Sequence, residues 1–186
     1  MLPLQIHLTL PAWIADVVDA RLRYDSDEDR VGLAIALSRQ NVQHGGGGPF
    51  GAAVFDGDSG QLVAVGVNRV LPQSCSVAHA EIMALTTAQQ RLGRHRLNGD
   101  GGRWVLASSS QPCCQCYGAS VWAGIDELLI GARAEDVEQL TEFDEGPLPA
   151  DWIGELTRRD IIVRRDILRE QARTVLAAYG VSGTPY

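Results

Sequence analysis

The chain has 186 residues, of which 45% are hydrophobic and 21% are charged, and this length allows one domain with a sizeable core. A formal net charge of −7 argues against a nucleic-acid surface, because proteins that bind phosphate backbones usually carry a basic footprint. No apolar run reaches the length of a membrane span, and the apolar first residues lack the basic start of a signal peptide. We therefore expect neither nucleic acid nor membrane as a partner.

Helical and strand patterns alternate along the chain. The first helix is predicted to begin at Ser26, with acids in its first turn and Val31, Ala34 and Leu37 on one apolar face, and the glycines at 45–48 end it. A strand pattern, a turn and a second strand pattern come next. Together they predict a hairpin. In order, the predicted elements are a helix over 26–44, strands over 50–56 and 61–70, a helix over 80–93, a strand over 103–109, a helix over 113–124, strands over 125–132 and 160–167, and a helix over 168–180.

This order predicts a three-layer α/β/α domain built around one mixed sheet. Neither a repeat nor a linker divides the sequence, so we expect a single domain over residues 1–186. Its catalytic core is expected at about 27–146, followed by a C-terminal helical segment at about 150–186.

The cysteines point to metal or redox chemistry. Cys113, Cys114 and Cys116 crowd into the stretch PCCQC, and the fourth cysteine, Cys75, lies apart. Such crowding is unlike the spread framework of a disulfide-stapled secreted domain, so we expect a reduced, cytoplasmic protein. We interpret Cys75 and Cys114 as ordinary buried thiols.

Two short motifs, each opening a predicted helix, combine into a zinc site. Cys113 and Cys116 are three residues apart and share a helix face, and a helix N-terminus favours the thiolates that a metal requires. His79 can supply a third ligand, which leaves the fourth position of a tetrahedral site for water, the arrangement of catalytic zinc. Glu81, two residues beyond His79, would then carry protons. Taken alone, His79 is also compatible with a core histidine, and CCQC with a redox pair.

H-x-E followed by P-C-x-x-C is the signature of zinc-dependent base deaminases. Over about 100 residues, the segments GGGGPFGAAVF, VAVGVNRV, AHAEIMAL, QPCCQCYGASVWAG and FDEGPLPADW resemble the cytidine deaminase superfamily, and most of all its bacterial guanine deaminases. The resemblance implies a five-stranded sheet between helices, one catalytic Zn²⁺ per chain and a homodimer. It also implies that the C-terminal segment caps a site or is exchanged between subunits.

The resemblance assigns the site residues one by one. It makes His79, Cys113 and Cys116 the zinc ligands and Glu81 the proton shuttle.

It also assigns residues that contact the substrate. Asn68 would hydrogen-bond the substrate ring, and Phe50 and Trp122 would be aromatic residues of the pocket. Glu145 would lie against the purine and assist proton transfer. The chain departs from the family pattern at Gln111, where glutamate is usual, and at Gln115, where methionine is usual.

The expected reaction is hydrolytic deamination of a free base, with guanine converted to xanthine and ammonia. The alternative substrates are cytosine, an aminotriazine, a pterin or guanosine. A tRNA adenosine deaminase is disfavoured because it wants a basic surface. A zinc-binding module without catalysis is disfavoured because zinc binding does not need Glu81.

Overall fold

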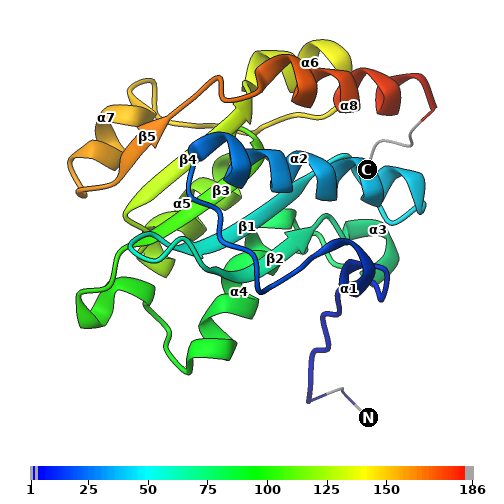
Figure 1. Cartoon of the computed structure of the whole chain (residues 1–186). Helices are drawn as coiled ribbons and strands as arrows, with labels where there is room; N and C mark the ends of the chain where they lie inside the picture. Colours follow the sequence, from blue (N-terminus) through cyan, green and yellow to red (C-terminus); the bar gives the residue numbers. More distant parts are fainter. Residues whose placement is uncertain (1, 3, 183–186) are drawn as a thin grey trace.

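The computed structural model describes residue 2 and residues 4–182, and Figure 1 shows the arrangement of its elements. The elements are α1 (Ile14–Val17), α2 (Asp27–Gln43), β1 (Gly51–Asp56), β2 (Leu62–Val67), α3 (Val70–Gln73), α4 (Ala80–Leu92), η1 (Leu97–Asp100), β3 (Trp104–Ser110), α5 (Cys114–Ala123), β4 (Glu127–Ala132), α6 (Ala134–Leu140), α7 (Trp152–Thr157), β5 (Ile162–Arg164) and α8 (Arg169–Ser182). Within this part of the chain, no helix is both long and apolar enough to cross a membrane.

The five strands form one mixed sheet in the order β2-β1-β3-β4-β5. β1 pairs antiparallel with both β2 and β3, which confirms the predicted hairpin, whereas β3–β4 and β4–β5 are parallel. The parallel pairs carry α5 and α7 in their connections, as crossovers between parallel strands require. The five-stranded mixed sheet is therefore confirmed.

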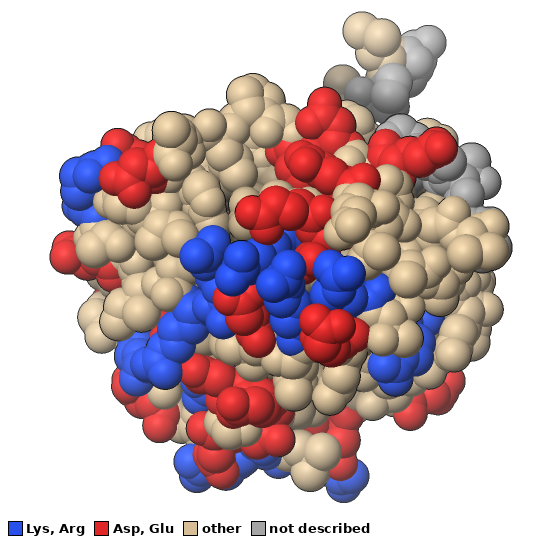
Figure 2. Space-filling model, turned by 90° about the horizontal axis from the view of Figure 1, so that it is seen from above, with Lys and Arg blue, Asp and Glu red and all other residues tan. Residues whose placement is uncertain are grey.

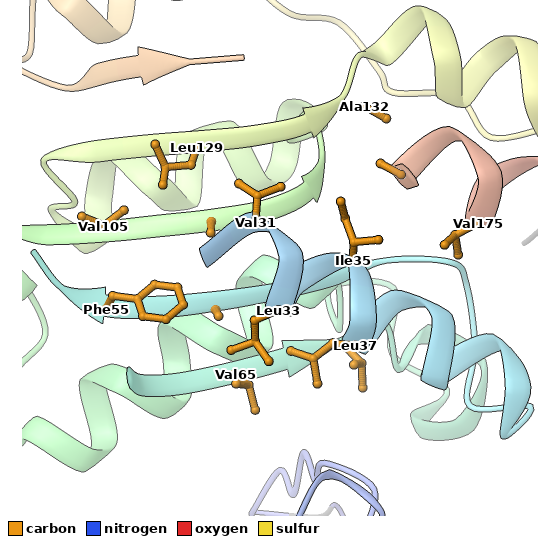
Figure 3. Packing of buried hydrophobic residues seen from close by; sticks show 14 of the residues in the cluster. Val31, Leu33, Ile35, Leu37, Phe55, Val65, Val105, Leu129, Ala132 and Val175 are labelled. Carbon is orange, nitrogen blue, oxygen red and sulfur yellow. The ribbon is translucent and has the colours of Figure 1, made fainter. Parts of the chain in front are cut away.

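Helices cover both faces of this sheet, so the predicted three-layer architecture is also confirmed (Figure 1). On one face, α2 and α8 pack over side chains such as Phe55, Val105 and Leu129, and Val31, Ile35 and Leu37 of α2 project into this core (Figure 3). On the other face, α4 and α5 pack over alternate residues of the same strands, including Val54 and Leu106. Successive residues of a strand point to opposite faces, so buried strands supply two cores at once.

Some details of the sequence prediction were wrong. The second strand ends at Val67, and the short helix α3 begins at Val70, where the sequence predicted more strand. The acidic segment Ala134–Leu140 forms the helix α6, for which the sequence predicted neither helix nor strand.

Helix α4 approaches the sheet very closely. A Cβ atom on Gly66 of β2 would lie 2.0 Å from the carbonyl oxygen of Ala80, so only glycine allows this contact. The buried side of α4 is accordingly lined with small residues such as Ala84 and Ala88, together with Met83 and Leu85. The close approach fixes the N-terminal end of α4, where His79 and Glu81 lie.

The C-terminal segment packs on its own chain. Helix α8 lies beside α2 and α6 (Figure 1). Asp136 of α6 accepts hydrogen bonds from Arg169, at 2.7 Å, and from Arg173. Residues 183–186, at the end of the segment predicted to cap or exchange, lie outside the described residues.

Candidate active site

The N-termini of two helices, α4 and α5, lie close together, and each carries a predicted zinc ligand. His79 is the N-cap residue of α4 and Cys113 is the N-cap residue of α5. An N-cap side chain usually accepts a hydrogen bond from the first turn of its helix, but neither of these does so. The two side chains meet each other instead, so the imidazole and the thiol are directed into a shared site.

The spacing of the three ligand atoms fits zinc. The Nδ1 atom of His79 lies 3.5 Å from the Sγ of Cys113 and 3.6 Å from the Sγ of Cys116. A tetrahedral zinc with Zn–S of about 2.3 Å and Zn–N of about 2.05 Å separates these atoms by about 3.6 Å. All three ligand atoms lie within 4.8 Å of one another. The donor set of one nitrogen and two sulfurs is therefore spaced as zinc requires, with one coordination position left open.

The two thiols differ in acidity. The pKa of Cys113 falls to about 4, first because the Cys116 thiol hydrogen-bonds to it and then because of His79. The pKa of Cys116 is raised, chiefly by the same hydrogen bond and by burial. Without metal the pair thus holds one thiolate and one thiol. Binding of zinc would displace the remaining proton, because a ligating cysteine must be deprotonated.

Glu81 lies in the first turn of α4, beside this triangle. Its side chain is 6% exposed, and its Oε1 accepts a hydrogen bond of 3.2 Å from the Ser108 hydroxyl of β3. Burial raises the pKa of Glu81, and the negative charge of Cys113 adds to the effect. A carboxyl group with a raised pKa is suited to taking up and releasing a proton near neutral pH.

His79, Cys113 and Glu81 line a cavity of about 400 Å³. The loop after α6 contributes residues 142–145 to its wall, and Phe50 lines the cavity as well. This volume suits a single heterocyclic base. No Lys or Arg lines the described cavity, whereas Glu81, Glu142, Asp144 and Glu145 all do, so a substrate carrying a phosphate group is disfavoured.

Glu145 comes to the site from a distant part of the sequence, as predicted. It is 7% exposed, and its backbone oxygen accepts a 2.9 Å hydrogen bond from the amide of Cys114, which ties the loop to the start of α5. Burial raises the pKa of Glu145 to about 8, and the negative charges of Cys113 and Glu81 contribute further. In the metal-free site Glu145 therefore keeps a proton at neutral pH and can donate a hydrogen bond as well as accept one.

An aromatic ladder supports the loop that carries Glu145. The Phe50 ring lies 5.3 Å from the Phe143 ring, and Phe143 stacks on Tyr179 of α8 at 5.8 Å, both measured between ring centroids. Phe50 and Phe143 both line the cavity. The sequence did not predict the contact of Phe143 with Tyr179, because helix α8 meets the loop only in the folded chain.

Asn68 is buried, but it is not among the residues that line the cavity. Its Oδ1 accepts hydrogen bonds from the backbone of Gly48 and Val70, at 3.3 and 3.2 Å. Val70 lines the cavity and Gly48 lies two residues before Phe50. The observed contacts of Asn68 thus hold the backbone beside the cavity.

The structure does not bring Trp122 to the predicted site of this chain. Its side chain is 80% exposed, near the C-terminal end of α5. Because a helix rises about 1.5 Å per residue, Trp122 lies about 9 Å along the helix axis from Cys116. Cys75 and Cys114 are only partly buried, where the sequence predicted buried thiols. All four cysteines are free.

A mixed sheet between helices, with one histidine and two cysteines grouped beside a buried glutamate, defines a zinc-dependent deaminase. A family model described as the cytidine and deoxycytidylate deaminase zinc-binding region matches residues 25–132. The chain belongs to this family.

Several known proteins resemble the chain. The structure of a guanine deaminase from Nitrosomonas europaea matches with 41% identity and a TM-score of 0.91, over 97% of this chain and 99% of that one. Another structure, of a complex with 2,6-diaminopurine, matches with 41% identity and a TM-score of 0.90, over 97% and 95% of the two chains. The guanine deaminase of Bacillus subtilis is 33% identical over 112 residues, which cover 60% of this chain and 67% of that protein.

Proposed function

We propose that this protein is a zinc-dependent guanine deaminase that converts guanine and water to xanthine and ammonia. The observation that carries the proposal is the His79, Cys113 and Cys116 triangle, spaced for tetrahedral zinc, with Glu81 buried beside it in a base-sized cavity. The choice of guanine is supported by two relatives that are guanine deaminases and by matching structures that hold 2,6-diaminopurine or 8-azaguanine.

In this proposal His79, Cys113 and Cys116 hold one zinc ion per chain. Zinc in such a site supplies Lewis-acid chemistry that makes water a nucleophile at neutral pH. Glu81 takes a proton from the water that adds at C2 of the base and passes it to a ring nitrogen. Glu81 next takes the second proton from the added hydroxyl group and passes it to the amino group, so that the C2–oxygen double bond of xanthine forms as the C2–nitrogen bond breaks and ammonia leaves.

The acidic wall formed by residues 142–145 has a separate role in the proposal. Glu145 forms a hydrogen bond with the base and assists proton transfer to the leaving group, while Phe50 packs against the ring. Asn68 also stays a predicted contact with the base. In support, Glu145 shares the cavity with Glu81, and its backbone is anchored to the helix that carries two zinc ligands.

Charge favours a free base over an RNA substrate. The net charge is −7, and the cavity is lined by acids. On the face over α6 and α8, arginines gather near the centre, with acidic side chains beside and among them (Figure 2). Arg133, for example, pairs with Asp166 at 2.7 Å. An RNA-binding surface would instead expose unpaired basic side chains.

We further propose a cytoplasmic homodimer. The four free cysteines support a reducing location. Trp122 and the aliphatic residues Leu4 and Ile6 near the N-terminus are more than three-quarters exposed, so an interface that covered them would remove apolar surface from water. Light scattering of the purified protein tests the dimer.

The deciding experiment for the function is a substrate panel. Zinc-loaded protein is incubated with guanine, guanosine, cytosine, a pterin, an aminotriazine and adenosine-containing tRNA, and product formation is measured. We expect the highest kcat/KM with guanine. A higher value with another member of the panel would overturn guanine as the substrate while leaving the deaminase class intact.

A further inference from the structure

Gln111 is a buried amide in the cavity that the proposed mechanism does not use. It follows the last residue of β3 and precedes Pro112 and the zinc ligand Cys113. Its backbone N–H donates to the carbonyl of Ala132 at 2.8 Å, which fixes the residue against the end of β4. It is 8% exposed and lines the same cavity as His79 and Glu81.

The side-chain amide of Gln111 makes no hydrogen bond to any other group in the described part of the chain. A carboxamide carries two N–H donors and one acceptor oxygen, and buried amides in folded proteins are nearly always paired. Because Gln111 lines the cavity, its amide is open to a molecule bound there. A molecule in the cavity is therefore the natural partner for this amide.

We propose that Gln111 determines specificity by pairing with the lactam edge of the base, and this inference rests on the proposed guanine deaminase function. Guanine presents the acceptor O6 beside the donor N1–H. A carboxamide matches this edge with two parallel hydrogen bonds, because its N–H₂ donates to O6 and its oxygen accepts from N1–H.

An ionised carboxylate at position 111 could not make the same pair of hydrogen bonds. It accepts but cannot donate, so it would leave O6 unpaired and place a negative charge against it. The amide is the neutral group of the same shape, and in this chain it can donate to O6 and accept from N1–H at once.

The proposal is tested by changing both the protein and the ligand and comparing the dissociation constants of the four combinations. Dissociation constants are measured for 8-azaguanine, which keeps the lactam edge, and for 2-aminopurine, which lacks the oxygen and the ring N–H. Both are measured with Gln111 intact and with Gln111→Leu, on zinc-loaded Glu81→Gln protein so that no ligand is turned over. We expect Gln111→Leu to weaken 8-azaguanine about tenfold and 2-aminopurine less than threefold.

The matched control is Gln139→Leu, the same change at an exposed position of α6. It should alter neither constant. Gln111→Glu should weaken 8-azaguanine at least as much as Gln111→Leu, and zinc content should stay at the wild-type level in all variants. Equal weakening of both ligands by Gln111→Leu, or no weakening, would overturn the pairing. Failure of the proposed function is separately visible, as absence of guanine turnover by the wild-type protein.

Discussion

Two parts of the cavity wall, a zinc end and a loop wall, are built in different ways. The zinc end consists of the N-cap residues and first turns of α4 and α5, which pack directly on the central sheet. The loop wall is held at one point by the hydrogen bond from Cys114 to Glu145 and at another by the stacking of Phe143 on Tyr179. The zinc end has the chemistry shared by many deaminases, so we expect selection of the substrate to depend mainly on the loop wall and on Gln111.

The largest expected effect is at the zinc end. Cys113→Ala or Cys116→Ala removes one of three protein ligands, so we expect loss of bound zinc and of all measurable deamination. Cys114→Ala is the matched control, because Cys114 lies outside the ligand triangle. Elemental analysis and turnover are measured together. Zinc loss on substitution of Cys114, with zinc retained by Cys113→Ala, would refute the ligand assignment.

Glu81→Gln separates metal binding from proton transfer at the same end of the cavity. The amide retains the shape of the side chain but cannot carry a proton, so we expect kcat to fall by roughly 10²–10⁴-fold. Zinc content and thermal stability should stay close to wild type. Near-normal kcat in a fully zinc-loaded variant would show that another group carries the proton.

Glu145→Ala is the corresponding test of the loop wall. We expect guanine turnover to fall at least tenfold while zinc stays bound. The base then loses its hydrogen-bonding partner, and a polar group left without a partner in a buried site is costly. Glu142→Ala, an exchange on the same loop, is the comparison for a general loss of negative charge. Wild-type turnover by Glu145→Ala would return this residue to a purely structural role.

The support of the loop by α8 predicts a smaller effect. Tyr179→Leu removes the stacking on Phe143, and an aromatic pair contributes about 0.5–1.5 kcal/mol. We therefore expect kcat/KM for guanine to fall about three- to tenfold, with zinc content unchanged. Val181→Ala, an exposed change on the same helix, is the control, and Tyr179→Phe should restore most of the loss. Loss of zinc from Tyr179→Leu would contradict the idea that the zinc end is held independently of the loop wall.

The smallest effect concerns the attachment of α8 and depends on pH. The pKa of Asp136 is lowered to about 2, first because Arg169 hydrogen-bonds to it. A folded-state pKa below the ordinary value of 3.8 gives stability that is present above pH 4 and is lost as the pH falls toward 2. We expect Asp136→Asn to cost about 1–2 kcal/mol of unfolding free energy at pH 6.

That cost should shrink as the pH is lowered below 4, because the wild-type carboxyl then also loses its charge. Urea unfolding at a series of pH values measures it, with Asp166→Asn as a more exposed comparison. A constant difference between wild type and Asp136→Asn across this range would show that the charge of Asp136 does not stabilise the fold.

The sequence alone determined the sheet, the main helices and the zinc chemistry. These features are local: periodicity marks each strand and helix, and H-A-E and P-C-C-Q-C each lie within one turn of a helix start. The residue types His79, Cys113 and Cys116 allow few other chemistries once both motifs are present. Glu145 was predicted only from the resemblance to a family, because no rule of residue spacing places it at the site.

Only the tertiary structure decided which other side chains reach the site. Trp122 follows the zinc motif closely in sequence, yet it lies on the exposed side of α5 because a helix directs successive residues in different directions. Tyr179 is 36 residues beyond Phe143, and the packing of α8 on the sheet brings the two rings together. Gln111 shows the same principle: its burial and its lack of a protein partner depend on how β3, β4 and two helix ends enclose one cavity.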